Sequence, residues 1–312
     1  MMTNSIPFGA RSTADQVLAG IDLTGQRIVV TGCSSGIGFE TMNALAANGA
    51  HVIGLARSLA DAQLACAKAG PSCSPVACDL SDLKSVAAAA ATVRALQSPL
   101  DALVTNAAIA RLPSLRTRYG VELQFLVNHV GHFALVSALA DQVRSGTGRI
   151  VVVSSRASID RAPPEGILFD NLDGHRFYEP AMFYGQSKLA NALFAKELSH
   201  RLSERGITVN SLDPGATRGT GIDRNLHKPS KILRSATKVF AKTAPRGAAT
   251  QALLAANPSV SGISGEYWSN CQIAQGSPLL ENADLARRLW DVTADIIARH
   301  DATGANALRE AA

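Results

Sequence analysis

A glycine-rich segment near the start of the chain constrains the fold more than any other feature. It runs from Thr31 to Gly38, after the apolar run Ile28–Val30 and before a helical run from Phe39 to Ala47. Glycines let a backbone approach a pyrophosphate closely, and the N–H groups at a helix start face the anion. Strand, glycine turn and helix in this order predict a dinucleotide-binding unit, although the spacing here is Gly-x-x-x-Gly-x-Gly. A glycine-rich turn without a ligand stays as the alternative.

From Arg27 onward, apolar strand-like runs alternate with longer helical runs. Strands are expected at 28–31, 51–56, 75–79, 102–106, 149–155, 208–213 and 265–268. Helices are expected near 37–48, 59–69, 81–96, 119–144, 181–205, 245–256 and 282–300. This alternation predicts an α/β fold: a single doubly wound Rossmann domain over residues 23–312, with a parallel sheet of about seven strands and helices on both faces. Residues 1–22 are expected to form a polar tail with one short helix, Ala14–Ala19, capped by Ser12 or Thr13.

Composition and charge disfavour several classes of protein. Of the 312 residues, 46% are hydrophobic and 18% charged, so we expect a globular protein with a sizeable core. The net charge of +5 suits an anionic cofactor, but no Lys/Arg tract is interleaved with aromatics, which argues against nucleic-acid binding. The five cysteines include no Cys-x-x-Cys pair and the seven histidines show no metal-ligand spacing, so reduced thiols and no metal site are expected.

The sequence also carries an expectation about location. No apolar run approaches the roughly 20 residues needed to cross a bilayer. Met1–Leu23 lacks the basic region followed by an apolar one that marks a secretory signal. We therefore expect a cytoplasmic protein, with membrane contact disfavoured and a homodimer left open.

A tyrosine and a lysine stand four residues apart, at Tyr184 and Lys188, and no other tyrosine of the chain has a lysine at that offset. On a helix this spacing places both side chains on one face. A fixed positive charge favours the phenolate and so eases loss of the phenol proton. Tyr184 is therefore a candidate general acid/base for an alcohol or a ketone.

The glycine-rich segment and the Tyr184–Lys188 pair together resemble the short-chain dehydrogenase/reductase family, from about Leu23 to Arg299. Further similar segments are Thr105–Ala108, Asn128–Phe133, Ser154-Ser155 and Pro214-Gly215. The segment Asn128–Phe133 resembles the retinol-dehydrogenase-like branch. Ser12–Gly25 and Gly265–Asn270 are also similar to WW-domain-containing oxidoreductases, although no WW domain is expected here.

The resemblance implies a catalytic set of four residues and a reaction. Tyr184 would exchange a proton with the substrate oxygen, and Lys188 would lower the pKa of that phenol and bond the nicotinamide ribose. Ser155 would hold the substrate carbonyl oxygen, where charge develops. Asn128 would hold a water that leads to the lysine. The reaction implied is the interconversion of a carbonyl and an alcohol on a fairly apolar small molecule.

The same resemblance implies the cofactor contacts. They are expected from Gly32, Ser34, Ser35, Gly36, Ile37, Gly38, Arg57, Asp79, Leu80, Asn106, Ala107, Tyr184, Lys188, Pro214, Gly215 and Thr217. Asp79 would meet the adenine amino group, or it would cap the next helix, a role that Ser81 could also fill. Thr220 is the alternative to Thr217 as the contact with the nicotinamide carboxamide.

The end of the second strand predicts NADP(H) as the cofactor. NAD enzymes of this fold place an acid there to bind the ribose hydroxyls, and that acid would repel a 2′-phosphate. Here the expected position is Ala56, and Arg57 follows it. An arginine can pair with the phosphate through charge-assisted hydrogen bonds. Ser34 and Ser58 could add neutral donors.

Two long connections, 156–182 and 216–242, are expected to be substrate lids at the carboxyl ends of the strands. The second carries cations at helical spacing, which predict a solvated helix face or, alternatively, contact with anionic lipid: Lys228, Lys231, Arg234, Lys238 and Lys242.

Other functions on this fold stay open. One is a non-catalytic NADP(H)-binding module that senses redox state, and another is an epimerase or dehydratase. The presence of all four catalytic residues favours an oxidoreductase.

Overall fold

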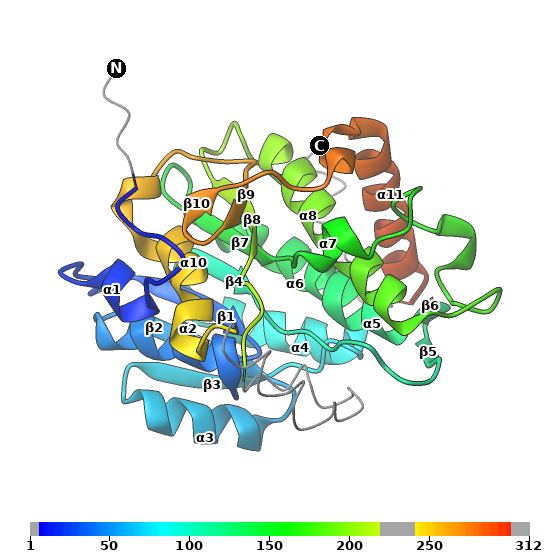
Figure 1. Cartoon of the computed structure of the whole chain (residues 1–312). Helices are drawn as coiled ribbons and strands as arrows, with labels where there is room; N and C mark the ends of the chain where they lie inside the picture. Colours follow the sequence, from blue (N-terminus) through cyan, green and yellow to red (C-terminus); the bar gives the residue numbers. More distant parts are fainter. Residues whose placement is uncertain (1–5, 219–240, 301–312) are drawn as a thin grey trace, which may run out of the picture.

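The computed structural model describes residues 6–218 and 241–300 (Figure 1). One sheet has the strand order β10-β9-β8-β7-β4-β1-β2-β3, running from the top to the bottom of Figure 1. All neighbours pair in parallel except β9 and β10. The strands are β1 Arg27–Thr31, β2 His51–Ala56, β3 Cys73–Ala77, β4 Ala102–Thr105, β7 Arg149–Val153, β8 Thr208–Asp213, β9 Tyr267–Ser269 and β10 Gln272–Ile273.

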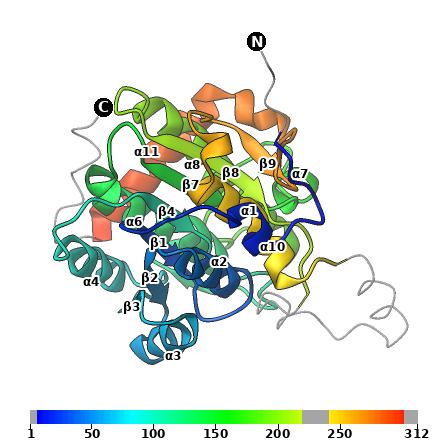
Figure 2. The same ribbon diagram turned by 90° about the vertical axis from the view of Figure 1, so that its left-hand side faces the viewer.

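Helices cover both faces of the sheet because its strands are apolar on both sides. Within β7, Ile150 and Val152 belong to one core cluster, whereas Val151 and Val153 belong to the other. Figure 2 shows α4, α6 and α11 on one side of the strands and α1, α2 and α10 on the other. The longer helices are α2 Gly36–Ala47, α3 Leu59–Ala69, α4 Leu83–Arg94, α6 Gly131–Leu139, α8 Pro180–Arg201, α10 Ala244–Ala256 and α11 Ala283–His300.

These observations confirm the doubly wound α/β fold, with an eighth strand, β10, added at the edge. Three strand predictions were wrong by two residues at one end or both, and one of them is β9, which begins at Tyr267 and not at 265. β3 lies two residues earlier than expected, so Asp79 follows the strand instead of ending it. β7 ends at Val153, which leaves Ser154 and Ser155 beyond the sheet edge.

The expected helix at 119–144 is interrupted. A hairpin precedes it, with β5 Thr117–Arg118 paired to β6 Val121–Glu122, and Gly120 turns it at a φ of +73°. The helical part then consists of α5 Leu123–Phe125, the π-helical η1 Leu126–Val130 and α6. Apolar periodicity does not separate an α-turn from a π-turn, so the sequence did not show this change.

The N-terminal segment was expected to be a polar tail, but its short helix contributes apolar side chains to the core. Thr13 caps α1 Ala14–Leu18 in a capping box with Gln16. Val17 and Leu18 are buried in the core cluster that includes α2 and α10. The carbonyl of Val17 also accepts a hydrogen bond from Asn257. This short helix is therefore part of the domain core.

One apolar segment does reach membrane-spanning length, contrary to the sequence expectation. The stretch Leu123–Gln142 has 20 residues and a mean hydropathy of 1.3, and 78% of its most apolar window is buried inside the protein. Among the described residues no other helix meets this criterion. Packing against the sheet accounts for its apolar character.

The structure describes the first of the two expected lids in full and the second only in part. The first connection, 156–182, contains the short helix α7 Ala157–Asp160 and buries Ile167 and Leu168. Residues 219–240 of the second lie outside the described residues, together with four of its five cations and Thr220. The fifth, Lys242, is not helical: it forms a parallel bridge with Thr217.

Candidate active site

The glycine-rich segment follows β1 at the carboxyl edge of the sheet and leads into α2. Gly32 and Gly36 have φ values of +71° and +59°, which disfavour other residues. A Cβ atom on Gly38 would lie 2.3 Å from the side-chain nitrogen of Asn106. Ser34 and Ser35 are exposed on the turn. The segment thus presents bare backbone at the start of a helix, as an anion requires.

Hydrogen bonds fix this turn to the neighbouring strand β4. The backbone nitrogens of Asn106 and Ala107 donate to the Thr31 hydroxyl oxygen, at 2.9 and 3.0 Å. The Asn106 amide donates back to the Thr31 carbonyl at 2.9 Å and accepts from Gln251 of α10 at 3.2 Å. Gln251 was missed by sequence reasoning, because nothing local marks it.

The end of β2 carries no acid. Ala56 is buried there, and Arg57 is exposed and forms no ion pair within the described residues. Ser58 caps α3 and its hydroxyl bonds Asp61, so it is partly engaged.

Asp79, after β3, accepts two hydrogen bonds from Ser81, at 2.9 and 2.8 Å. The expectation that Asp79 or Ser81 caps the next helix was wrong, since Asp82 caps α4 through the Lys84 N–H. Leu80 places its carbonyl 2.4 Å from where a Cβ of Gly131 would lie, so the turn after β3 packs tightly on α6.

Tyr184 and Lys188 lie in α8, which begins at Pro180 with Glu179 as its cap. The Lys188 ammonium is 5.9 Å from the centre of the Tyr184 ring. Lys188 is 1% exposed and donates to the Val153 carbonyl at 3.0 Å, at the end of β7. Burial lowers the pKa of Lys188 to about 7, and the charge of Asp213 offsets part of that shift.

The adjacent serines have different roles. The Ser154 hydroxyl is buried and donates to the Lys188 carbonyl at 2.7 Å, so it ties β7 to α8. The Ser155 oxygen accepts from the Ala157 N–H at 3.2 Å, a bond that does not consume its hydroxyl hydrogen. Ser155 therefore keeps the donor that a substrate oxygen would need, and Ser154 does not.

Asn128 lies within the π-helical η1 and is fully buried. Its side chain accepts from the Ile109 N–H at 2.8 Å and donates to the Ile109 carbonyl and to Ser187, both at 2.9 Å. The amide is thus occupied by protein groups and holds the chain that follows β4. The backbone carbonyl oxygen of Asn128 lies 2.9 Å from His132 Nδ1.

The segment after β8 turns sharply at Pro214-Gly215. Gly215 has a φ of +81°, and its N–H donates to Asp213 at 3.0 Å. The Thr217 hydroxyl donates to the Gly215 carbonyl at 3.0 Å. A Cβ on Gly247 would lie 2.7 Å from the Thr217 oxygen and 3.1 Å from Ile37, so this segment borders the glycine-rich turn.

Comparison with known proteins decides the family. A family model for short chain dehydrogenases matches residues 26–166. The WW domain-containing oxidoreductase of Homo sapiens is 37% identical over 302 residues, covering 93% of this chain and 72% of that protein. Retinol dehydrogenase 14 of Homo sapiens is 35% identical over 291 residues, covering 86% of this chain and 85% of that protein. The chain belongs to the short-chain dehydrogenase/reductase family.

A solved short chain dehydrogenase from Burkholderia cenocepacia, in complex with NADP, has a TM-score of 0.63. The two sequences are 29% identical, and the match covers 78% of this chain and 96% of the solved one. The expected family and its retinol-dehydrogenase-like branch are confirmed by these relatives. As a short-chain dehydrogenase/reductase, the chain is an oxidoreductase that binds a nicotinamide cofactor and acts on a small molecule.

The carboxyl edge of this short-chain dehydrogenase fits such a cofactor. The glycine-rich turn leads into the N-terminus of α2, where backbone N–H groups can face phosphates, and exposed Arg57 lies at the end of the neighbouring strand. Lys242 is a further cation that sequence reasoning placed on a solvated face. Its side chain instead lies 3.0–3.3 Å from the Cβ position of Gly215, and burial lowers its pKa. In the described part of the chain no cluster of three metal-ligating side chains occurs.

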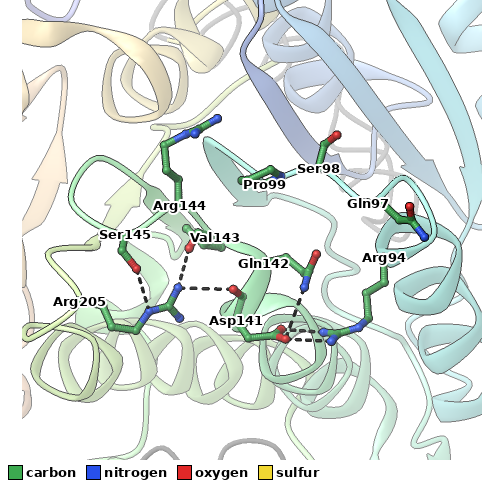
Figure 3. A pocket seen from close by; sticks show the side chains of 10 residues that line it. All are labelled: Arg94, Gln97, Ser98, Pro99, Asp141, Gln142, Val143, Arg144, Ser145 and Arg205. Atoms are coloured by element: carbon green, nitrogen blue, oxygen red, sulfur yellow. Dashed lines mark hydrogen bonds and ion pairs between the residues drawn. The ribbon is translucent and has the colours of Figure 1, made fainter.

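A pocket of about 580 Å³ lies at the opposite, amino edge of the same sheet (Figure 3). Arg94 forms two bonds with Asp141 there, at 2.6 and 2.8 Å. Arg205 donates to the carbonyls of Ala140 and Val143, at 2.7 and 2.6 Å. These cations tie neighbouring segments together, and none of the expected site residues lines this pocket.

Proposed function

We propose that this protein is an NADP(H)-dependent oxidoreductase that interconverts a carbonyl and an alcohol on a fairly apolar small molecule. The observation that carries the proposal is the buried Lys188 beside Tyr184, bonded to the Val153 carbonyl at the end of β7, two residues before Ser155. Lys188 forms no ion pair within the described residues, and the charge of Asp213 offsets only part of the cost of its burial, which indicates a functional role. The bound nicotinamide would supply or accept the hydride at the substrate carbon.

The residues of the chain would manage the proton at the substrate oxygen. Tyr184 donates it to the forming alkoxide, and the Ser155 hydroxyl hydrogen bonds the same oxygen. The ammonium form of Lys188 favours the Tyr184 phenolate, and its pKa of about 7 makes that charge sensitive to pH near neutrality. The Asn128 carbonyl would hold the water that resupplies Lys188.

The preference for NADP(H) rests on the end of β2. Ala56 offers no acid to accept hydrogen bonds from ribose hydroxyls, and it repels no phosphate. Arg57 is exposed and forms no ion pair within the described residues, so it can meet a 2′-phosphate at little cost. The solved relative in complex with NADP supports this choice.

The connection 156–182 supports an apolar substrate. It leaves the carboxyl end of β7 directly after Ser155 and carries two exposed apolar side chains, Ile159 at 38% and Phe177 at 48%. These side chains would give an apolar ligand a surface to cover. We propose that this connection covers the substrate, and that the protein works in the cytoplasm.

A substrate screen tests the proposal. The purified protein is mixed with NADPH, and separately with NADH, against ketones, aldehydes, retinoids, steroids and aromatic polyketides. Cofactor oxidation that depends on one of these carbonyls, faster with NADPH, supports the proposal. Tight NADPH binding without turnover on any compound would favour a non-catalytic module. Conversion of a substrate without net cofactor oxidation would favour an epimerase or dehydratase.

A further inference from the structure

A buried histidine joins the cofactor-binding turn to the helical segment that carries Asn128. His132 is 1% exposed and lies at the start of α6. Its Nε2 is 2.9 Å from the Thr31 hydroxyl oxygen, at the end of β1. Its Nδ1 is 2.9 Å from the Asn128 carbonyl oxygen, in η1. The imidazole therefore bridges the end of β1 and η1, and its bond to Thr31 joins residues 101 apart in the chain.

Counting donors settles the tautomer of His132. The Thr31 hydroxyl oxygen already accepts from two backbone N–H groups, those of Asn106 and Ala107. Its two lone pairs are used, so its hydrogen must point at the imidazole. Nε2 then accepts, Nδ1 carries the hydrogen, and Nδ1 donates to the Asn128 carbonyl. Burial lowers the pKa of His132 to about 4, and the nearby charge of Lys188 acts in the same direction.

His129, three residues earlier, provides an internal contrast. It is 1% exposed, and its Nε2 is 3.0 Å from the Thr293 hydroxyl oxygen. Thr293 gives its own hydrogen to the Leu289 carbonyl at 2.7 Å. The hydrogen between His129 and Thr293 must therefore come from His129 Nε2. The two buried histidines of this segment carry their hydrogens on opposite nitrogens, and only His132 touches the site.

His132 bonds the backbone carbonyl of Asn128, a residue of the predicted catalytic set. Asn128 lies in a π-helical turn, where backbone bonds follow a wider register than in an α-helix. Both hydrogens of the Asn128 amide and one lone pair of its oxygen are engaged, so we assign the water that would lead to Lys188 to the backbone carbonyl of Asn128. His132 bonds that carbonyl and fixes its direction. Through Thr31 the same ring also fixes the turn that packs on Asn106 and Ala107.

We propose that His132 is a positioning residue, which aligns the Asn128 carbonyl with the cofactor-binding turn as a neutral Nδ1–H imidazole. The alignment follows from the hydrogen bonds alone, and its effect on turnover rests on the function proposed above. The charged group that faces His132 is Lys188 from α8, and His129 is its titratable neighbour on the helix.

Nitrogen-15 NMR of histidine-labelled protein tests the alignment without any turnover. We expect an Nδ1–H signal pattern for His132 and an Nε2–H pattern for His129, both unchanged from about pH 5.5 to about pH 8.5. The variants His132→Asn and His129→Asn assign the two signals. An Nε2–H tautomer for His132, or its titration near the ordinary histidine pKa, would overturn the proposal, whether or not the protein proves to be an oxidoreductase.

Two substitutions separate the two bonds. His132→Asn keeps an amide near the Nδ1 position, and His132→Gln keeps one near the Nε2 position. We expect His132→Asn to weaken NADPH binding about tenfold with kcat held, and His132→Gln to lower kcat about tenfold with NADPH binding held. His129→Asn should lower the melting temperature and leave both quantities unchanged. If the His132 variants also lower only the melting temperature, His132 is structural and the proposal fails.

Discussion

Charged side chains gather at both ends of the parallel strands, the amino edge and the carboxyl edge of the sheet, but they have different roles there. At the amino edge, Arg94 pairs with Asp141 while both side chains stay about half exposed. At the carboxyl edge, Lys188 is almost wholly buried and donates to the Val153 carbonyl. The hydrogen bonds of the exposed pair raise the pKa of Arg94 and lower that of Asp141, so both stay charged, whereas burial moves the pKa of Lys188 toward neutrality. Burial of Lys188, which the charge of Asp213 offsets only in part, and not the number of charges, distinguishes the candidate site from the structural edge.

The largest expected effect comes from the carboxyl edge. Tyr184→Phe removes the proton donor and keeps the ring, so kcat should fall at least roughly a hundredfold, with NADPH affinity nearly intact. Tyr178→Phe is the matched control, since the Tyr178 hydroxyl bonds the Leu112 carbonyl. Turnover is measured with the best compound of the screen. If Tyr184→Phe keeps wild-type turnover, Tyr184 is not the proton donor, and the carboxyl edge is no longer distinguished from the amino edge by this residue.

Two exposed arginines, one at each edge of the sheet, test which edge binds the cofactor. Arg57→Ala should raise the KM for NADPH roughly tenfold to a hundredfold and leave that for NADH almost unchanged, because a charged hydrogen-bond partner is lost. Arg94→Ala, at the amino edge, should change neither value. Steady-state kinetics with both cofactors provide the measurement. A similar loss with NADH and NADPH would contradict the 2′-phosphate role of Arg57.

The pKa of Lys188 should appear in the stability of the cofactor-free protein. Folding lowers this pKa to about 7, so above that pH the unfolded chain binds more protons than the folded one. Wild type should therefore gain stability relative to Lys188→Met as pH rises from about 7 to about 8.5, by at most about 1.4 kcal/mol per pH unit. Urea unfolding at each pH measures the difference.

Lys196→Met is the control on the same helix, since Lys196 lies at its partly exposed surface and donates to the Gly265 carbonyl. It should show no such trend. A difference between wild type and Lys188→Met that does not vary with pH would mean that Lys188 keeps an ordinary pKa.

The smallest effect is expected at the amino edge. A double-mutant cycle on Arg94 and Asp141 should give a coupling of about 0.2–1 kcal/mol, because both side chains face water. Neither substitution should alter turnover. A change in kcat from either one would give this edge a role in the reaction.

The sequence predicted the parts of the site that depend on local order. The glycine-rich turn follows from three glycines between a strand and a helix, and the Tyr184–Lys188 pair follows from helical spacing. The choice of Ser155 over Ser154 needed the family pattern, and the structure adds a physical reason through the Ser154–Lys188 bond.

Long-range contacts could not be predicted. The His132–Thr31 bond joins residues 101 apart and the Gln251–Asn106 bond joins residues 145 apart, so no local pattern marks them. The π-helical turn at Asn128 has the same apolar pattern as a regular helix. Lys242 was assigned to a solvated face because spacing alone does not reveal what a side chain packs against.

Deuterium transfer tests the central claim most directly. The protein is incubated with NADPH deuterated at nicotinamide C4 and the responsive ketone, and the alcohol product is examined by mass spectrometry. Deuterium at the carbinol carbon, formed by wild type and nearly abolished in Tyr184→Phe, is the predicted result. NADPH consumption with no deuterium in the product, or equal transfer by Tyr184→Phe, would contradict it.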